Sequence, residues 1–209
     1  MICMQDFENP RSCLGYIISG KPLYVSVLAI FTALTTVFTI FVQVPIPATG
    51  GYFNFGDAGV IMGALLFGPW VGGFAGGVGS MLGDIITGYS YFAPLTLLAK
   101  GLEGFLVGLV ANPRAQRGRV GWQDFVGVVP GGAAMILTYF FGEMQFFGGI
   151  GAALDELPGN FIQIAGGTAI ALAAIVAVRY YLFTNYPLLR STFFAAPPTS
   201  EPARVQPPE

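Results

Sequence analysis

Apolar side chains fill six runs of the sequence, and the short segments between these runs are richer in polar residues, Pro and aromatics. A helix needs roughly 20 apolar residues to cross a bilayer, and fewer where protein shields it from lipid. The second run is short for a full span. A helix of its length covers only about half of the hydrocarbon thickness. We predict membrane-spanning helices at residues 23–42, 57–67, 70–86, 94–111, 125–141 and 161–182.

The composition supports a membrane protein. Of the 209 residues, 54% are hydrophobic and only 10% are charged, whereas a soluble domain carries roughly 25% charged residues. A single small soluble core could not bury so much apolar surface. The glycines lie inside the apolar runs, in pairs four apart such as Gly72 and Gly76, and such pairs are typical of close helix packing. The predicted fold is an all-α membrane protein, a bundle of six transmembrane helices.

Basic residues predict the orientation, because Lys and Arg accumulate in cytoplasmic loops. The chain has nine, and all but Lys100 fall on one side of a six-span arrangement. We therefore expect a multi-pass protein of the cell membrane with both termini and the 112–124 loop in the cytoplasm. Residues 1–22 form the N-terminal segment, 23–182 the bundle, and 183–209 a Pro-rich tail without regular structure. Cys3 and Cys13 lack CxxC spacing and are expected to be reduced thiols.

Aromatic residues concentrate in the three loops on the opposite, outer side. The segments 43–56, 87–93 and 143–160 contain eight aromatic residues, together with amides and carboxylates. Aromatic residues at a membrane boundary are often simple interfacial anchors. The alternative is a pocket whose aromatic faces stack on a planar solute under a folded loop.

Four charged residues lie inside or at the ends of apolar runs. Lys100 is within the fourth run, and Glu103 follows three residues later on the same helical face. Asp57 opens the second run and Asp84 closes the third, so all four are expected in one layer near the outer side. Charges at bilayer depth are costly and mark either a functional site or a structural ion-pair network.

Motifs for catalysis are missing from the sequence. The chain has no histidine, which removes the commonest metal ligand and general base. It also has no Walker motif and no nucleophile elbow. We expect no enzyme activity, catalytic residue, cofactor or metal site, and the net charge of −2 without a basic stripe argues against nucleic acid as a partner.

Three stretches, NFGDAGVIMGALLFGPWVGGFAGGVGSMLGDII, YFAPLTLLAKGLEGFLVGLVA and ELPGNFIQIAGG, resemble the substrate-binding S component of energy-coupling factor (ECF) vitamin transporters. The resemblance covers residues 23–182. It implies a six-helix S-component bundle in which the loop after the first helix closes over an outward-facing pocket. Ala29 and Ala33 match the AxxxA motif that docks on the transmembrane coupling subunit, and two ATPase subunits would complete the importer.

The resemblance places the pocket in the first loop and in the outer parts of helices four to six. With the charged layer added, the expected ligand-binding residues are Tyr52, Asn54, Asp57, Asp84, Tyr89, Tyr91, Lys100, Glu103, Glu143, Gln145, Asn160 and Gln163. The expected ligand is a small vitamin or precursor, with hydroxymethylpyrimidine, thiamine or pyridoxine favoured over riboflavin. Two alternatives stay open: an ion-coupled transporter or channel using Asp57, Asp84, Lys100 and Glu103, and a scaffold whose buried charges are structural.

Overall fold

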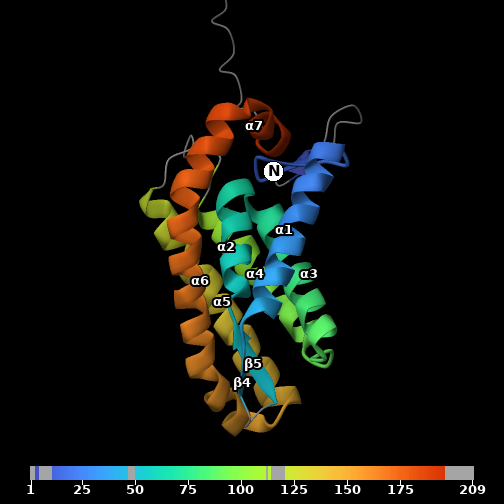
Figure 1. Cartoon of the computed structure of the whole chain (residues 1–209), viewed down its shortest axis with the longest axis vertical. Coiled ribbons are helices and arrows are strands. Elements are labelled where there is room, and N and C mark those ends of the chain that lie inside the picture. The colour runs from blue at the N-terminus through green and yellow to red at the C-terminus, as the bar shows by residue number, and fades with distance from the viewer. Residues whose placement is uncertain (1–2, 5–10, 47–49, 112, 114–120, 196–209) are drawn as a thin grey trace, which may run out of the picture.

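The chain folds into an elongated helical bundle with a two-stranded hairpin at one end and a short helix with a small sheet at the other (Figure 1). The computed structural model describes residues 3–4, 11–46, 50–111, 113 and 121–195. The helices are α1 (Pro22–Phe41), α2 (Gly56–Phe67), α3 (Pro69–Thr87), α4 (Ala93–Ala111), α5 (Trp122–Phe146), α6 (Gly149–Asn185) and α7 (Pro187–Phe193). The strands are β1 (Cys3–Met4), β2 (Arg11–Cys13), β3 (Tyr16–Ile18), β4 (Gln43–Ile46) and β5 (Gly51–Asn54).

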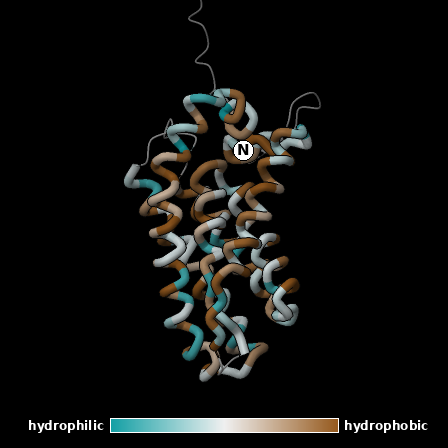
Figure 2. The backbone as a smooth tube through the Cα atoms, in the orientation of Figure 1, coloured by the Kyte–Doolittle hydropathy of each residue, from teal (hydrophilic) through white to brown (hydrophobic). Residues whose placement is uncertain are grey.

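The six predicted runs correspond to helices α1 to α6, so the all-α membrane class is confirmed. Within the described residues, α1, α4, α5 and α6 are long and apolar enough to cross a membrane. Hydrophobic positions run along the long helices in Figure 2. We call the end with β4 and β5 the hairpin end, and the end with α7 and β1–β3 the terminal end (Figure 1).

The short helix α2 lies in the middle of the bundle, and every one of its 12 residues is buried. A helix of this length rises about 18 Å, well short of a bilayer. The hairpin directly precedes α2 and lies beyond its first turn, because β5 ends at Asn54 and α2 begins at Gly56 (Figure 1). β4 and β5 pair antiparallel from Gln43 opposite Asn54 to Ile46 opposite Gly51, which satisfies backbone groups that lipid could not.

Glycines permit close contact between α3 and its neighbours. A Cβ at Gly104 of α4 would lie 2.1 Å from the Gly72 carbonyl oxygen of α3. A Cβ at Gly79 would lie 2.8 Å from the Cβ of Thr35 on α1. These helices therefore meet backbone to backbone, as the glycine spacing predicts.

Helix α6 begins twelve positions earlier than predicted, at Gly149 instead of 161. The segment 143–160, expected as an outer loop, is therefore mostly helical. Its polar residues Glu156 and Asn160 are buried against other elements, with 4% and 5% of their surfaces exposed. Hydropathy placed the start of α6 too late, because it treats polar residues as loop. Polar residues that face the protein interior are compatible with a helix.

The terminal end also differs from the expectation. The range 183–209, expected to lack regular structure, includes the end of α6 and all of α7. The ring of Phe193 in α7 packs against that of Phe67, with centroids 4.5 Å apart. Residues 196–209 lie outside the described part. Cys13 is disulfide-bonded and the strand register places Cys3 opposite it, so the prediction of reduced thiols is wrong.

Arg179, which we assigned to the cytoplasmic basic cluster, is buried within the bundle at the terminal end. Its two terminal nitrogens donate to the Asp124 carboxylate of α5 at 2.9 and 2.8 Å. One of them also donates to the Leu65 carbonyl oxygen at 2.6 Å, in the last turn of α2. A bidentate pair of this kind joins α2, α5 and α6 at a fixed geometry.

Candidate ligand pocket

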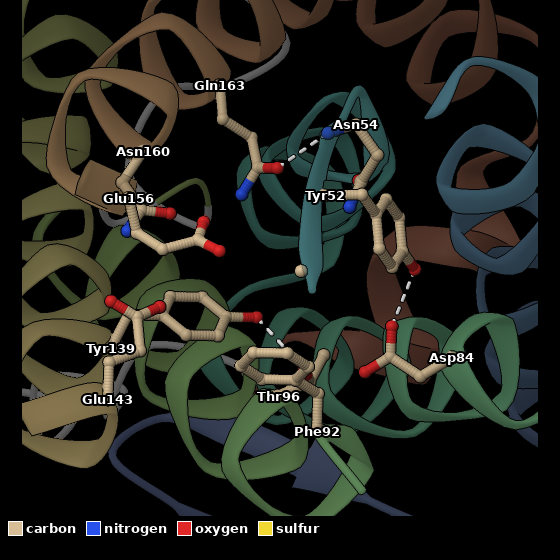
Figure 3. Close-up of a pocket in the computed structure, with 11 residues that line it drawn as sticks. Tyr52, Asn54, Asp84, Phe92, Thr96, Tyr139, Glu143, Glu156, Asn160 and Gln163 are labelled. Atoms are coloured by element: carbon tan, nitrogen blue, oxygen red, sulfur yellow. Dashed lines mark hydrogen bonds between the residues drawn. The ribbon is translucent and has the colours of Figure 1, made fainter. Parts of the chain in front are cut away.

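A cavity lies at the hairpin end, between β5 and the ends of α3, α4, α5 and α6 (Figure 3). Its volume is about 30 Å³, which is room for a few water molecules at most. A ring-shaped ligand therefore requires the lining side chains to move apart. The lining residues are Gly51, Tyr52, Asn54, Asp84, Phe92, Thr96, Tyr139, Glu143, Glu156, Asn160 and Gln163.

Two hydrogen bonds hold the hairpin over this cavity. The Tyr52 hydroxyl donates to Asp84 Oδ1 at 2.6 Å, which links β5 to α3. The Asn54 backbone N–H donates to Gln163 Oε1 at 2.8 Å, which links β5 to α6. Burial and the Asp84 carboxylate raise the pKa of Tyr52, so the phenol stays protonated and remains a donor to Asp84.

Carboxylates enter the cavity from three different helices. Asp84 of α3, Glu143 of α5 and Glu156 of α6 are 2%, 2% and 4% exposed. Among the described residues that line the cavity, none is a lysine or arginine. Buried polar atoms of the lining that lack a hydrogen-bond partner within the described structure are Asp84 Oδ2, Glu143 Oε2 and Asn160 Nδ2.

Aromatic rings form the remaining wall. The Tyr139 hydroxyl donates to Thr96 Oγ1 at 3.1 Å, and the Phe92 ring stacks on Phe147 with centroids 4.3 Å apart. Tyr52 in turn lies 4.4 Å from the ring of Tyr89. The pocket thus combines apolar faces with a few convergent polar groups, which is typical of small-molecule sites.

Asp84 is the one member of the predicted charged layer that lines this cavity; the other three assemble beside it. Lys100 Nζ donates to Asp57 Oδ1 and lies 3.5 Å from Glu103 Oε2. All three side chains are buried. Tyr139 connects the two sites, because Lys100 Nζ lies 5.7 Å from its ring centroid while Tyr139 also lines the cavity.

The structure therefore divides the predicted site residues into groups. Those that line the cavity are Tyr52, Asn54, Asp84, Glu143, Asn160 and Gln163. Tyr89 backs the Tyr52 ring, Tyr91 is half exposed and donates to the Gly50 carbonyl oxygen, and Gln145 is exposed. Asp57, Lys100 and Glu103 form the adjacent ion-pair cluster.

Sequence reasoning missed several lining residues, and helical spacing was the signal that could have identified them. Tyr139 lies one helical turn before Glu143, and Glu156 one turn before Asn160, so each pair shares a helix face. Phe92, directly before α4, and Thr96, in its first turn, are also four residues apart. Apolar context hid Tyr139, and the misplaced start of α6 hid Glu156.

A second feature lies on the lipid-facing side of α1. Ala29 and Ala33 are exposed and line an open groove of about 420 Å³ between α1 and α3. Its other lining residues are two threonines and four apolar residues, including Phe74 and Leu82. The groove presents small side chains that allow another helix to approach closely.

A helical membrane protein with a polar and aromatic pocket at one end has the architecture of a solute-binding transport component. Residues 21–180 match the family described as ECF-type riboflavin transporter, S component. The chain therefore belongs to the S components of ECF transporters, which are membrane-embedded subunits of vitamin-type transport and not enzymes. The resemblance seen in the sequence is confirmed.

Relatives and a solved structure agree with this assignment. An uncharacterised protein in the gap 3′ region of Pyrococcus woesei is 44% identical over 135 residues, covering 65% of this chain and 87% of that protein. The thiamine precursor transporter HmpT of Lactococcus lactis subsp. cremoris (strain MG1363) is 30% identical over 148 residues, covering 70% of this chain and 81% of that protein. The fold matches the structure of a bacterial ECF transporter S component with TM-score 0.56 at 17% identity, covering 76% of this chain and 96% of that one.

Proposed function

We propose that this chain is the substrate-capture subunit of an ECF-type importer. It binds a small vitamin or vitamin precursor at the hairpin end, which faces the outside, and an ATP-driven module delivers the ligand inward. The observation that carries this proposal is the cavity at the hairpin end, where two buried polar atoms, Glu143 Oε2 and Asn160 Nδ2, have no hydrogen-bond partner in the described structure. Such atoms cost free energy unless a ligand satisfies them.

The ligand we favour is a small ring such as hydroxymethylpyrimidine, thiamine or pyridoxine. The cavity is compact, and a single ring requires less rearrangement of its walls than the three fused rings of riboflavin. The names of the relatives point in two directions, riboflavin for the family and a thiamine precursor for HmpT. The pocket therefore has to be tested with a panel.

Calorimetry on the detergent-purified full chain tests the capture function directly. We expect submicromolar binding of at least one member of a panel of hydroxymethylpyrimidine, thiamine, pyridoxine and riboflavin. Folding of the same sample is checked by its thermal unfolding transition. A folded protein that binds no panel member would overturn the proposal.

The orientation is part of the same proposal. Lys21 and Arg190 are basic residues at the terminal end. This end would therefore face the cytoplasm, as the distribution of Lys and Arg indicates. A single cysteine introduced at Trp122 in a background without Cys3 and Cys13 should resist membrane-impermeant maleimide in intact cells. Labelling there would place the pocket on the wrong side for capture from outside.

An ion-coupled transporter is the second candidate, because Glu103 carries carboxylate oxygens without a hydrogen-bond partner within the described structure. The cluster of Asp57, Lys100 and Glu103 is fully enclosed, which favours a structural role. Ligand uptake by liposomes that contain only this chain, driven by an ion gradient, would instead support the transporter.

A further inference from the structure

We infer that a groove between β3, the start of α1 and α7 binds an anionic phospholipid, whose phosphate is held by Lys21. The groove has a volume of about 310 Å³, which lies within the range of small-molecule sites, roughly 300–1,000 Å³. It is at the terminal end, at the opposite end of the bundle from the candidate ligand pocket (Figure 1). This inference is independent of the proposed capture function.

Contacts at the terminal end fix the walls of this groove. The Ala195 N–H donates to the Gly15 carbonyl oxygen at 3.0 Å, which ties the chain after α7 to the turn before β3. The Phe193 ring of α7 stacks on the Tyr24 ring of α1 with centroids 4.9 Å apart. The groove is therefore formed before a ligand arrives, which reduces the ordering cost of binding.

Lys21 supplies a positive charge that the described protein does not neutralise. Its side chain is exposed and lines the groove, and it is in none of the ion pairs formed among the described residues. Asp124, the carboxylate that the described structure has at this end, is buried and held by Arg179. An exposed ammonium at the boundary of a membrane attracts the phosphate of an anionic lipid.

Hydroxyl groups beside Lys21 match the remainder of a lipid headgroup. Ser19 Oγ accepts a hydrogen bond from the Lys21 backbone N–H at 3.1 Å, so its own proton stays available for a phosphate oxygen. Ser191 and Thr192 both donate to the Leu188 carbonyl oxygen, at 3.1 and 2.8 Å, which leaves their oxygens as acceptors. This set of one cation, one donor and two acceptors is complementary to a phosphodiester that carries a hydroxyl, such as phosphatidylglycerol.

The apolar surroundings of the groove favour a lipid over a free phosphate. Leu23 and Leu188 are part of its lining, and Leu188 is 66% exposed. Val25 is also exposed, one turn after Lys21 on a helix long and apolar enough to cross a membrane. Tyr186, half exposed at the same end, is of the residue type that concentrates at the membrane–water interface. Acyl chains can therefore contact the apolar wall while the phosphate stays at the level of Lys21.

Two lipids with the same acyl chains test the site. Native mass spectrometry of the detergent-purified full chain compares the binding of dioleoylphosphatidylglycerol with that of dioleoylphosphatidylcholine, which has no net charge. We expect phosphatidylglycerol to bind about fivefold tighter, and Lys21→Gln to reduce this preference to about twofold or less. Arg190→Gln is the matched control, because it removes the same charge at the same end. Its guanidinium lies 6.0 Å from the Phe183 ring centroid and is not among the described groups that line the groove, so the preference should remain.

Equal affinity for the two lipids, or an equal loss of preference in Lys21→Gln and Arg190→Gln, would overturn the inference. Thermal unfolding separates the two sources of phosphate: phosphatidylglycerol should raise the transition temperature of the wild-type protein, and millimolar inorganic phosphate should not. A shift with inorganic phosphate as large as with the lipid would overturn the lipid assignment. Because Lys21 is exposed, Lys21→Gln should fold as the wild type does. If it does not, Ser191→Glu places a carboxylate in the groove and should remove the preference for phosphatidylglycerol; a preference that persists there would likewise overturn the inference.

Discussion

The Tyr52 hydroxyl lies 2.6 Å from Asp84 Oδ1 and donates to it, which connects the hairpin to the end of α3 over the pocket. Tyr52 and Asp84 are far apart in the sequence but both line the cavity. Opening the pocket toward the hairpin requires this contact to break. The pair is therefore a direct target for mutation.

Tyr52→Phe removes the donor and leaves the buried Asp84 carboxylate with one partner fewer. We expect ligand affinity to fall by about tenfold, because hydrogen bonds to charged groups contribute about 1.5–3 kcal/mol. Calorimetry with the tightest panel ligand measures the change. Tyr180→Phe, at an exposed tyrosine of α6, is the control; equal effects of the two variants would exclude a role for the Tyr52 hydroxyl in closure.

Lys100→Met should destabilise the protein by about 3–5 kcal/mol, because it leaves the buried Asp57 carboxylate unpaired. The double variant Asp57→Asn with Lys100→Met should recover much of this loss. Thermal unfolding in detergent compares the three proteins. We also expect weaker ligand binding in Lys100→Met, since Tyr139 packs near the ammonium and lines the pocket; unchanged affinity in a folded variant would leave the cluster a purely structural role.

Arg179→Met tests the second buried ion pair, at the terminal end. Loss of the bidentate bonds to Asp124 should again destabilise the fold by about 3–5 kcal/mol. Ligand affinity of the remaining folded protein should stay within twofold of wild type, since Arg179 is near the opposite end of α6 from the pocket. Arg190→Ala, which is only partly buried, provides the comparison, and similar thermal transitions for both variants would contradict the prediction.

Gly104→Ala should separate α3 from α4. The added Cβ would lie 2.1 Å from the Gly72 carbonyl oxygen, a backbone atom that cannot rotate away, so we expect a loss of about 1–3 kcal/mol. Gly101→Ala on the same helix is the matched control, because its nearest contact is 3.6 Å. That variant should be neutral or slightly stabilising, by the helix propensity of Ala over Gly. Equal thermal stability of the two variants would show that α3 and α4 tolerate a wider separation.

Ala29→Trp should leave ligand affinity unchanged and abolish uptake, because it fills the groove on α1 where we place the coupling subunit. Binding is measured by calorimetry, and uptake in cells that also express the coupling subunit and the two ATPases. Val176→Trp, at an exposed site on α6, controls for a bulky residue facing lipid. Normal uptake by Ala29→Trp would show that the docking surface lies elsewhere.

The sequence by itself determined the membrane class, the approximate helices and some of the residues that face inward near the hairpin end. This follows from the solvent: lipid demands long apolar helices, and a charge within one of them has to face protein. Glycine spacing likewise indicated close helix packing, whereas the structure shows which helices meet, among them α3 and α4.

Only the tertiary structure separated the charged residues into two sites. Asp84 joined Glu143 and Glu156 around the cavity, whereas Lys100 formed the adjacent cluster with Asp57 and Glu103. The distances between helices remote in sequence decide which carboxylates lie beside the Lys100 ammonium. Hydropathy carries no information on those distances. The early start of α6 was hidden for a related reason, because its polar turns are stable only where the other helices and the hairpin enclose them.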